Sequence, residues 1–533
     1  MAFIKFMIEL RIALKSNNMT TMFNRYKQCA KLIDDVLHSK IFMFFTALFT
    51  VVMFFIIMIS LQTIKGVNVI PAFKNINLDV LKNSIAVIVV YFALIISCSL
   101  MFSKDMAILI FPIMLLPIPM FYIIPEAFTY KKLYIALAGI IGVILILKIL
   151  KNIKRIKVGK FFFPILLISF IVMIGGIGTL PLKTYIQFPG IIHYLMLGPM
   201  FILMYVVVNS NLYKTERDSL KTIAYAMLFV AFALVIIIVF SHVYLFSIYV
   251  YNNGGRALLE NGFSAIIKDY TFYMPWKNLT SQLLLLTIPG IFYLYNVTEK
   301  HKVWYFVAIA FIVIVGMSTM ARVGVLFGVI IFAIVSAMVL INSKNSSKPL
   351  YYIVLGSIFI ALFLTLFLVD SNLFDYKNIL TIHKGEARIH MYKKAIETFL
   401  EHPFLGHGLL FDPNIPAYKK DNTVGMYWVH QNILQILSNF GVIGLLGYIY
   451  ASVKVIKYIK KISKNEKIFG LFFLAVYFML GLFDIVGFMA VPYEFMLVFV
   501  LAALEGKYKD VDDREVDVSQ YVETDLDIAT IAD

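Results

Sequence analysis

The sequence predicts an all-α polytopic membrane protein, and its composition and the spacing of its apolar residues lead to this prediction. Hydrophobic residues make up 61% of the 533 residues, charged residues make up 15%, and the mean hydropathy is +0.87. A soluble domain has roughly half apolar and about a quarter charged residues. The apolar residues also gather in runs of about twenty, the length that a helix needs to cross a bilayer. We therefore expect about fourteen transmembrane helices and one large extracytoplasmic loop containing an amphipathic helix.

The charge balance and the cysteines exclude several other classes of protein. Lys and Arg outnumber Asp and Glu by 47 to 31, which gives a net charge of +16. Basic residues of membrane proteins gather in cytoplasmic loops. Those of this chain stand between apolar runs, so we expect no nucleic-acid partner. With only Cys29 and Cys98, neither a disulfide framework nor a thiolate metal site is expected.

The order of segments along the chain follows from the apolar runs. Residues 1–40 form a basic segment, and the run after it is too long for the core of a cleaved signal peptide, so it is expected to be the first span. Residues 41–369 hold spans one to eleven, residues 370–430 form the large loop, residues 431–505 hold three more spans, and residues 506–533 form an acidic disordered tail. The expected spans are 41–63, 85–102, 106–124, 133–150, 161–180, 190–208, 223–250, 279–297, 303–319, 323–341, 350–369, 432–453, 468–486 and 489–505.

The distribution of Lys and Arg gives an orientation. If the spans alternate from a cytoplasmic N-terminus, the basic stretches 148–160, 214–221, 300–302, 344–348 and 454–467 all fall inside. Lys131 and Lys132 fall outside and are the exception. The 370–430 interval, the loop 251–277 and the short connection at Arg322 then face outward, and both termini are cytoplasmic.

The outer loop contains a predicted amphipathic helix followed by a turn. Arg388, Tyr392, Ala395, Ile396 and Phe399 share one side of an ideal helix, while charged residues occupy another. Pro403 disfavours helical backbone at the residue before it, so the helix should end there. The glycines of the sequence His402-Pro-Phe-Leu-Gly-His-Gly408 then permit a tight turn.

Two arginines and one histidine are the strongest single candidates for chemistry. Arg388 interrupts an apolar helix face, so it either lines a polar cavity or extends to water as a structural residue. Arg322 lies between two apolar runs, where an arginine usually faces the protein interior or a ligand. His430 precedes a helix whose N-terminal partial positive charge favours a neutral imidazole, although a histidine at such a place, taken alone, is more often a capping or packing residue. Arg256 belongs to the other outer loop, where ordinary loop chemistry also explains it.

These motifs, taken together, resemble the O-antigen polymerase/ligase superfamily of membrane glycosyltransferases. The resemblance runs from about Asn278 to Leu446. Its elements are the Asn278 segment Pro-Trp-Lys-Asn-Leu-Thr, the segment Ser318-Thr-Met-Ala-Arg322, Arg388-x3-Tyr-x2-Ala, His402-Pro-Phe-Leu-Gly-His-Gly, His430-x3-Leu-Gln and Gly441-x2-Gly-Leu-Leu. Two positions depart from the family pattern: Ala321 stands in place of serine, and Gln431 stands where Asn usually follows the histidine, with Asn432 next.

The resemblance implies a GT-C-like fold and an inverting glycosyl transfer without metal or cofactor. The donor would be a glycan on a polyprenyl diphosphate, and the other partners a glycan acceptor, membrane lipid, and candidate flippase and chain-length regulator proteins. Arg388 and Arg322 would bind the diphosphate, since a guanidinium engages phosphate oxygens in a planar fork, with Arg256 as a weaker third. His430 would be the general base and Glu386 its reserve. The further substrate-binding residues expected from the motifs are Asn278, Tyr392, Gln431 and Asn432.

Three functions stay open at this point. A polymerase would join lipid-linked repeat units into O-antigen or capsule on the outer face of a bacterial cytoplasmic membrane. A ligase would hand the finished polymer to a lipid, protein or cell-wall acceptor. A flippase for the same lipid-linked glycan is the competing class, but transporters place charges at mid-membrane and often carry internal repeats. In this chain the side chains suited to chemistry are expected mostly at one face, in a long loop, which favours an enzyme.

Overall fold

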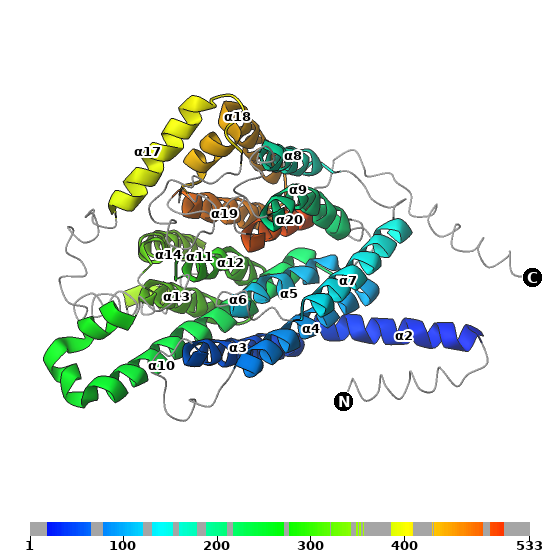
Figure 1. Cartoon of the computed structure of the whole chain (residues 1–533). Coiled ribbons are helices and arrows are strands. Elements are labelled where there is room, and N and C mark those ends of the chain that lie inside the picture. Colours follow the sequence, from blue (N-terminus) through cyan, green and yellow to red (C-terminus); the bar gives the residue numbers. More distant parts are fainter. Residues whose placement is uncertain are drawn as a thin grey trace, which may run out of the picture.

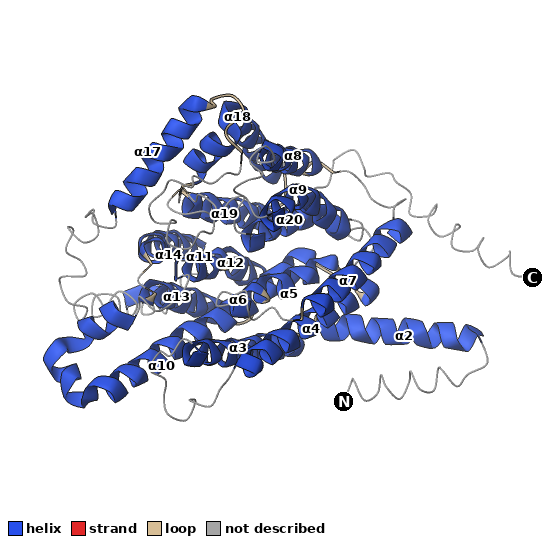
Figure 2. Cartoon of the chain, viewed as in Figure 1, coloured by secondary structure: helices blue, strands red, loops and turns tan. Residues whose placement is uncertain are grey.

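The protein is built from helices. A computed structural model of the chain describes residues 19–64, 78–120, 130–152, 159–178, 188–209, 217–270, 277–319, 321–342, 348–349, 351–352, 355–356, 385–408, 429, 431–482 and 491–505. Figure 2 shows helices joined by short loops and no strand within these residues. The all-α prediction is therefore confirmed for the part of the chain that is described.

The helices follow one another along the chain as the apolar runs predict. In the first half they are α2 (Met19–Leu37), α3 (Lys40–Ile64), α4 (Leu78–Phe102), η2 (Met106–Leu109), α5 (Ile110–Leu115), α6 (Pro117–Met120), α7 (Lys131–Asn152), α8 (Phe162–Gly178), α9 (Phe188–Asn209) and α10 (Ser219–Tyr270). In the second half they are α11 (Lys277–Leu286), α12 (Ile288–Val297), α13 (Lys302–Ser318), α14 (Arg322–Asn342), α17 (Gly385–Glu401), α18 (Asn432–Ile459), α19 (Lys464–Gly481) and α20 (Val491–Glu505).

Six of the described helices contain segments long and apolar enough to cross a membrane. The segments are Lys40–Ser60, Asp79–Phe102, Lys132–Lys151, Ser219–Tyr244, Gly324–Ile341 and Asn432–Ile459. Apolar helices such as Lys302–Ser318 are shorter. These lengths and compositions support a multi-pass membrane protein. The count of about fourteen spans stays a prediction, and the expected span at 350–369 and the acidic tail lie largely or wholly outside the described residues.

Two expected spans are divided into shorter helices at prolines. The run 106–124 is split into η2, α5 and α6, and α6 begins at Pro117. The run 279–297 is split at Thr287 into α11 and α12, and Pro289 lies in the first turn of α12. Proline has no backbone N–H, and its ring collides with the carbonyl four residues earlier, so a proline often kinks or ends a helix.

Helix α10 is longer than the sequence predicts. It has 52 residues and continues to Tyr270, so most of the expected outer loop 251–277 is helical, including the position of Arg256. Figure 1 shows that α10 bends toward its C-terminal end. The prediction of a loop from residue 251 rests on the loss of hydropathy there and is wrong, because the helix continues through Asn252-Asn-Gly-Gly-Arg256 and no proline interrupts it before Tyr270.

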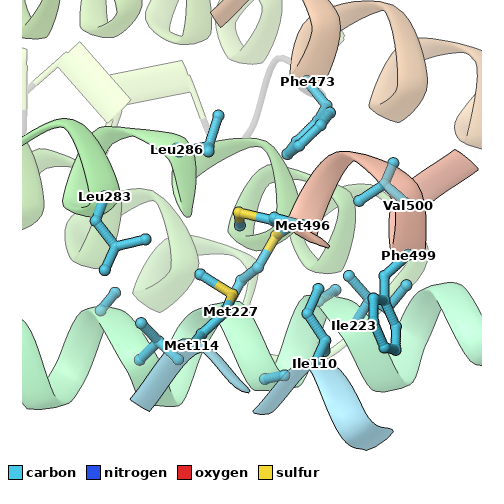
Figure 3. Packing of buried hydrophobic residues seen from close by; sticks show 14 of the residues in the cluster. Ile110, Met114, Ile223, Met227, Leu283, Leu286, Phe473, Met496, Phe499 and Val500 are labelled. Atoms are coloured by element: carbon cyan, nitrogen blue, oxygen red, sulfur yellow. The ribbon is translucent and has the colours of Figure 1, made fainter. Parts of the chain in front are cut away.

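The core joins helices that are far apart in the sequence. Helix α10 packs against α3 and α12, and α8 packs between α9 and α18. Figure 3 shows Met227 of α10 beside Met496 of α20, with Met114 of α5 and Phe473 of α19 around them. Methionine is unbranched and fills irregular gaps, which suits a place where several helices cross. Leucines of α11, Leu283 and Leu286 among them, complete the cluster and hold α11 in place.

Two groups of buried polar contacts fasten the end of the bundle that the charge distribution places inside. His38, between α2 and α3, lies with its Nδ1 3.2 Å from a carboxylate oxygen of Asp34 and its Nε2 3.7 Å from one of Asp105. Asp105 also accepts hydrogen bonds from the hydroxyls of Ser219 and Thr222 at the start of α10, at 2.9 and 2.7 Å.

The second group joins the first residues of α8 to the end of α20. Glu505, the last residue of α20, accepts hydrogen bonds from the backbone N–H groups of Lys160 and Phe161, both at 2.7 Å. These N–H groups precede α8 and have no partner within a helix, so the carboxylate acts as a cap. The contact fixes α8, against which α18 packs.

Candidate functional site

The turn that follows α17 is paired to α18 by backbone hydrogen bonds. Helix α17 ends at Glu401, as Pro403 predicts, and the chain then runs alongside α18 (Figure 1). Two N–H groups of the turn donate to α18, and two N–H groups of α18 donate back. The four bonds are His407 N to Ser438 O at 2.8 Å, Gly408 N to Asn439 O at 2.9 Å, Val442 N to Pro403 O at 2.8 Å and Ile443 N to Phe404 O at 3.2 Å. The pairing is possible because α18 is interrupted at Gly441.

Gly406 and Gly441 are required by this pairing. Gly441 has φ 65° and ψ −166°, a region that is essentially restricted to glycine. A Cβ atom on Gly441 would lie 2.4 Å from the carbonyl carbon of Phe404. Gly406 has φ 70°, and a Cβ atom there would lie 2.3 Å from the carbonyl carbon of Asn439. The two backbones touch at these points, and no larger residue fits at either one.

The joint at Gly441 is expected near one surface of the membrane. The eighteen residues 442–459 complete α18 after the interruption. At about 1.5 Å per residue they rise roughly 27 Å, close to the thickness of a bilayer's hydrocarbon core. The part of α18 before Gly441, and the turn paired to it, are therefore expected at the level of the headgroups.

A small apolar cluster brings α17 against the segment that precedes α18. Ala395 of α17 and Val429 are fully buried together, and Met391, Tyr392 and Leu434 pack around them. Arg388 is seven residues before Ala395, so its position lies on the same face of α17, two turns earlier. Glu386 belongs to the first turn of the same helix. His430 itself lies outside the described residues, but it directly follows Val429.

Two glutamines hold the backbone on both sides of His430. The side-chain oxygen of Gln435 accepts a hydrogen bond from Val429 N at 2.8 Å, and Gln435 is 1% exposed. Gln431 is the N-cap of α18, and its side-chain oxygen accepts from Leu434 N at 2.5 Å. The motif predicts that Gln431 binds substrate, whereas Gln435 is not among the predicted site residues. The sequence signal for it is the motif His430-x3-Leu-Gln, in which Leu434 packs on Ala395 and Gln435 fastens Val429.

Asn432 also has a packing role in the structure. It is 7% exposed and lies against α19, where a Cβ atom on Gly481 would be 2.2 Å from its Nδ2. The start of α18 and the end of α19 are therefore in close contact.

Asn278 and Arg322 belong to a second group, formed by α11, α13 and α14. Asn278 is half-buried in the first turn of α11, and Arg322 is the first residue of α14. The two helices approach closely at Gly324, where a Cβ atom would lie 2.2 Å from the Oγ of Ser281. The structure thus brings together the two helices that carry Asn278 and Arg322 in their first turns.

The turn before Arg322 is held by hydroxyl groups. The Ser318 hydroxyl donates to Val315 O at 2.7 Å, so its oxygen accepts from Nε2 of His242, which lies 3.3 Å away on α10. Thr319 donates to Gly316 O at 2.7 Å and accepts from Ala321 N at 3.3 Å. Ala321, at the position where the family pattern has serine, is fully buried.

The two groups are linked through α19. Helix α19 packs against α11 and α14 on one side and against α18 on the other. Helices α11, α14 and α18 begin beside Asn278, Arg322 and His430, respectively. Under the predicted orientation all three N-termini point outward, and each carries a partial positive charge suited to an anionic ligand.

Arg256 is not brought to α17. It lies within α10, and Figure 1 shows the bent C-terminal part of α10 well separated from α17. Within the described residues, no group of three or more His, Cys, Asp and Glu side chains that could hold a metal ion is found. In the turn, the ring centroids of His402 and His407 are 4.9 Å apart.

Comparison with known proteins gives one match. A family model described as O-Antigen ligase matches residues 283–449. No curated protein and no solved structure matches the chain. The matched segment runs from α11 to α18 and contains Arg322, Arg388, Tyr392 and both glutamines that flank His430.

Proposed function

We propose that this chain, which belongs to the O-antigen polymerase/ligase superfamily, polymerises glycan repeat units carried on a polyprenyl diphosphate. The reaction would take place on the outer face of the cytoplasmic membrane and invert the anomeric centre, without a metal or cofactor. The family implies glycosyl transfer between a lipid-linked glycan and an acceptor. The polymerase assignment and the outer-face site are part of the proposal.

The contact between Ala395 and Val429 is the observation that supports this proposal most directly. It joins α17, which carries Arg388, to the residue that precedes His430. These two motifs are separated by an interval of which residues 409–428 lie outside the described part. Gln435 of α18 also bonds the backbone of Val429, and the turn after α17 is paired with the backbone of α18. These contacts support the proposal that a base and a guanidinium from separate motifs act on one substrate.

The residues suggest how the transfer proceeds. His430 takes the proton of the acceptor hydroxyl, whose oxygen forms a bond to the anomeric carbon of the donor. The bond from that carbon to the diphosphate oxygen breaks, and the polyprenyl diphosphate leaves with the electron pair. General-base assistance of this kind is worth roughly 10²–10⁴-fold in rate. Arg388 and Arg322 oppose the charge that develops on the leaving group, through charge-assisted hydrogen bonds.

Ligation is the alternative that the family description favours. In that case the acceptor is a lipid, protein or cell-wall group instead of a second lipid-linked chain. Deletion of the gene distinguishes the two on a glycan gel. Single repeat units indicate a lost polymerase, and long unattached chains indicate a lost ligase. A flippase would leave glycan size unchanged when purified protein receives lipid-linked repeat units in detergent.

The test of the proposal is the variant His430→Ala, assayed with a defined lipid-linked repeat unit. We expect loss of product by at least about 10²-fold, because the acceptor hydroxyl keeps its proton. The control is His301→Asn, which replaces an exposed histidine with φ 65° by a residue that tolerates this backbone conformation. A normal glycan length distribution from His430→Ala would contradict the base assignment, whereas absence of product from the unmodified protein would contradict the function itself.

A further inference from the structure

The turn after α17 exposes two large apolar side chains. Phe404 is 72% exposed and Leu405 is 59% exposed, although the backbone of the turn is paired to α18. Figure 1 shows this turn at the edge of the bundle, where α17 and α18 meet. Single exposed apolar residues are common, whereas a contiguous apolar patch marks contact with another protein or with a membrane. Whether Phe404 and Leu405 belong to such a patch depends on their neighbours.

The last turns of α17 carry further exposed apolar side chains. Ile396 and Leu400 are four residues apart, so they lie on one face of the helix, and both are exposed. The contact that buries Ala395 against Val429 leaves them uncovered. Next to them around the helix is the charged face, to which the exposed Glu397 belongs. An exposed apolar edge beside a charged face is typical of a helix that lies in a membrane interface.

On the other side, the turn adjoins an exposed apolar face of α18. The N–H of Ile443 donates to Phe404 O at 3.2 Å, so these two residues are neighbours across the pairing. Ile443, Leu446 and Tyr450 are all exposed, and their spacing of three and four residues puts them on one face of α18. They belong to the segment Asn432–Ile459, which is long and apolar enough to cross a membrane. This face is therefore expected to contact lipid, and the turn lies where it begins.

The length of α18 indicates the depth of the turn in the bilayer. Residues 442–459 rise roughly the thickness of the hydrocarbon core, so Ile443 is expected near the boundary between hydrocarbon and headgroups. Phe404 is bonded to Ile443, and Leu405 follows it. In an interfacial helix the apolar side chains enter the acyl boundary while the charged face stays in water. Lipid hydrocarbon is thus within reach of the exposed side chains of the turn.

We propose that Phe404 and Leu405, together with Ile396 and Leu400 of α17, insert into one leaflet of the bilayer and anchor the turn at the membrane interface. The partner of this apolar surface is lipid hydrocarbon. The pairing at Gly441 fixes the turn to α18, and the inserted side chains fix its depth. Helix α17 is thereby held at the membrane surface with its charged face toward water. This inference does not depend on the reaction that the protein catalyses.

The experiment measures the depth of a spin label in the purified full chain in lipid nanodiscs. A nitroxide is attached to Leu405→Cys in a background with Cys29 and Cys98 replaced by serine. Molecular oxygen concentrates in hydrocarbon and a nickel chelate stays in water, so the ratio of their collision rates with the nitroxide reports its depth. The control is Glu397→Cys on the charged face of α17, and the reference for lipid is Leu446→Cys in the span. We expect the oxygen-to-nickel ratio of Leu405→Cys to be several-fold above that of the control and close to that of the reference.

Two outcomes overturn the proposal. A ratio as low as that of Glu397→Cys places the turn in water. Low collision rates with both reagents mean that protein covers the turn, and rates that rise when each nanodisc holds a single chain identify the cover as a second copy. If Leu405→Cys does not fold, Leu400→Cys gives the same measurement, because Leu400 is 68% exposed at the end of α17.

Discussion

The two glutamines beside His430 show how single residues can place a reactive group without touching the substrate. Gln435 bonds the backbone N–H of Val429, and Gln431 bonds that of Leu434. The chain on either side of the imidazole is thereby tied to the first turn of α18. A general base must lie within hydrogen-bond reach of its proton, so a fixed backbone at this point is a condition for the proposed chemistry.

Replacement of Gln435 by leucine tests this positioning role. The change leaves the buried N–H of Val429 without an acceptor, which costs about 1–3 kcal/mol. We expect kcat to fall by at least about tenfold, since 1.4 kcal/mol is a factor of ten, while KM changes little. The control is Ile433→Ala, because Ile433 is 43% exposed on the same turn. Equal kcat values for Gln435→Leu and the control would show that the hydrogen bond from Val429 N to Gln435 does not position the catalytic residue.

The sequence could predict that residues 430–435 open a helix and that His430 lies at its start. It could not predict the acceptor role of Gln435, because the partner is a backbone group six residues earlier, in a non-helical segment. The same limit applies to His242, whose contact with Ser318 joins positions 76 residues apart. Patterns report which face of a helix is apolar, whereas single polar contacts depend on how helices meet.

At the scale of elements, the turn after α17 and the interruption of α18 form one unit. The glycines of the turn are predicted to allow close packing, and the structure shows what they pack against, namely the backbone of α18 around Gly441. The sequence also predicts the end of α17 correctly. It does not predict the interruption of α18, because glycine is tolerated within a helix, and only the paired backbone requires its unusual φ and ψ.

Gly441→Ala is expected to break the backbone pairing between the turn after α17 and α18. The alanine must adopt a backbone region that costs about 1–3 kcal/mol for a residue with a side chain, and its Cβ would lie 2.4 Å from the backbone of Phe404. We expect a lower melting temperature and loss of most activity. Gly142→Ala is the matched control, because that glycine is helical and a Cβ atom added to it would have nothing within 4 Å. Equal melting temperatures for the two variants would contradict the proposed joint.

At the scale of the whole molecule, the buried polar contacts around His38, at the end of the bundle that is predicted to be cytoplasmic, predict how stability depends on pH. Burial alone would lower the pKa of His38, but hydrogen bonds to Asp105 and Asp34 outweigh it and raise the pKa to about 9. Because the folded pKa lies above the unfolded value, the stabilisation is complete below about pH 6.5 and is lost as the pH rises through about 9.

The melting temperature of the protein in nanodiscs should therefore fall between pH 7 and pH 10. The variant His38→Gln keeps a polar side chain but cannot be charged, so its melting temperature should be lower at pH 7 and fall less steeply with pH. His301→Asn, at an exposed histidine, should follow the unmodified protein. Parallel curves for His38→Gln and the unmodified protein would show that this imidazole is uncharged when folded.

The orientation of the whole bundle decides whether the two groups of candidate residues can meet one substrate. The part of α18 after Gly441, residues 442–459, is long enough to cross a bilayer, so the two ends of α18 are expected on opposite sides. Lys393 is exposed on α17 near the first end, and Lys461 is exposed after the second. The basic stretch 454–467 places the second end inside by the distribution of positive charge.

In a background with Cys29 and Cys98 replaced by serine, a membrane-impermeant maleimide should label Lys393→Cys in intact cells. It should label Lys461→Cys only after permeabilisation. The reverse pattern would place α17 and the turn in the cytoplasm, where a donor presented on the outer face cannot reach them.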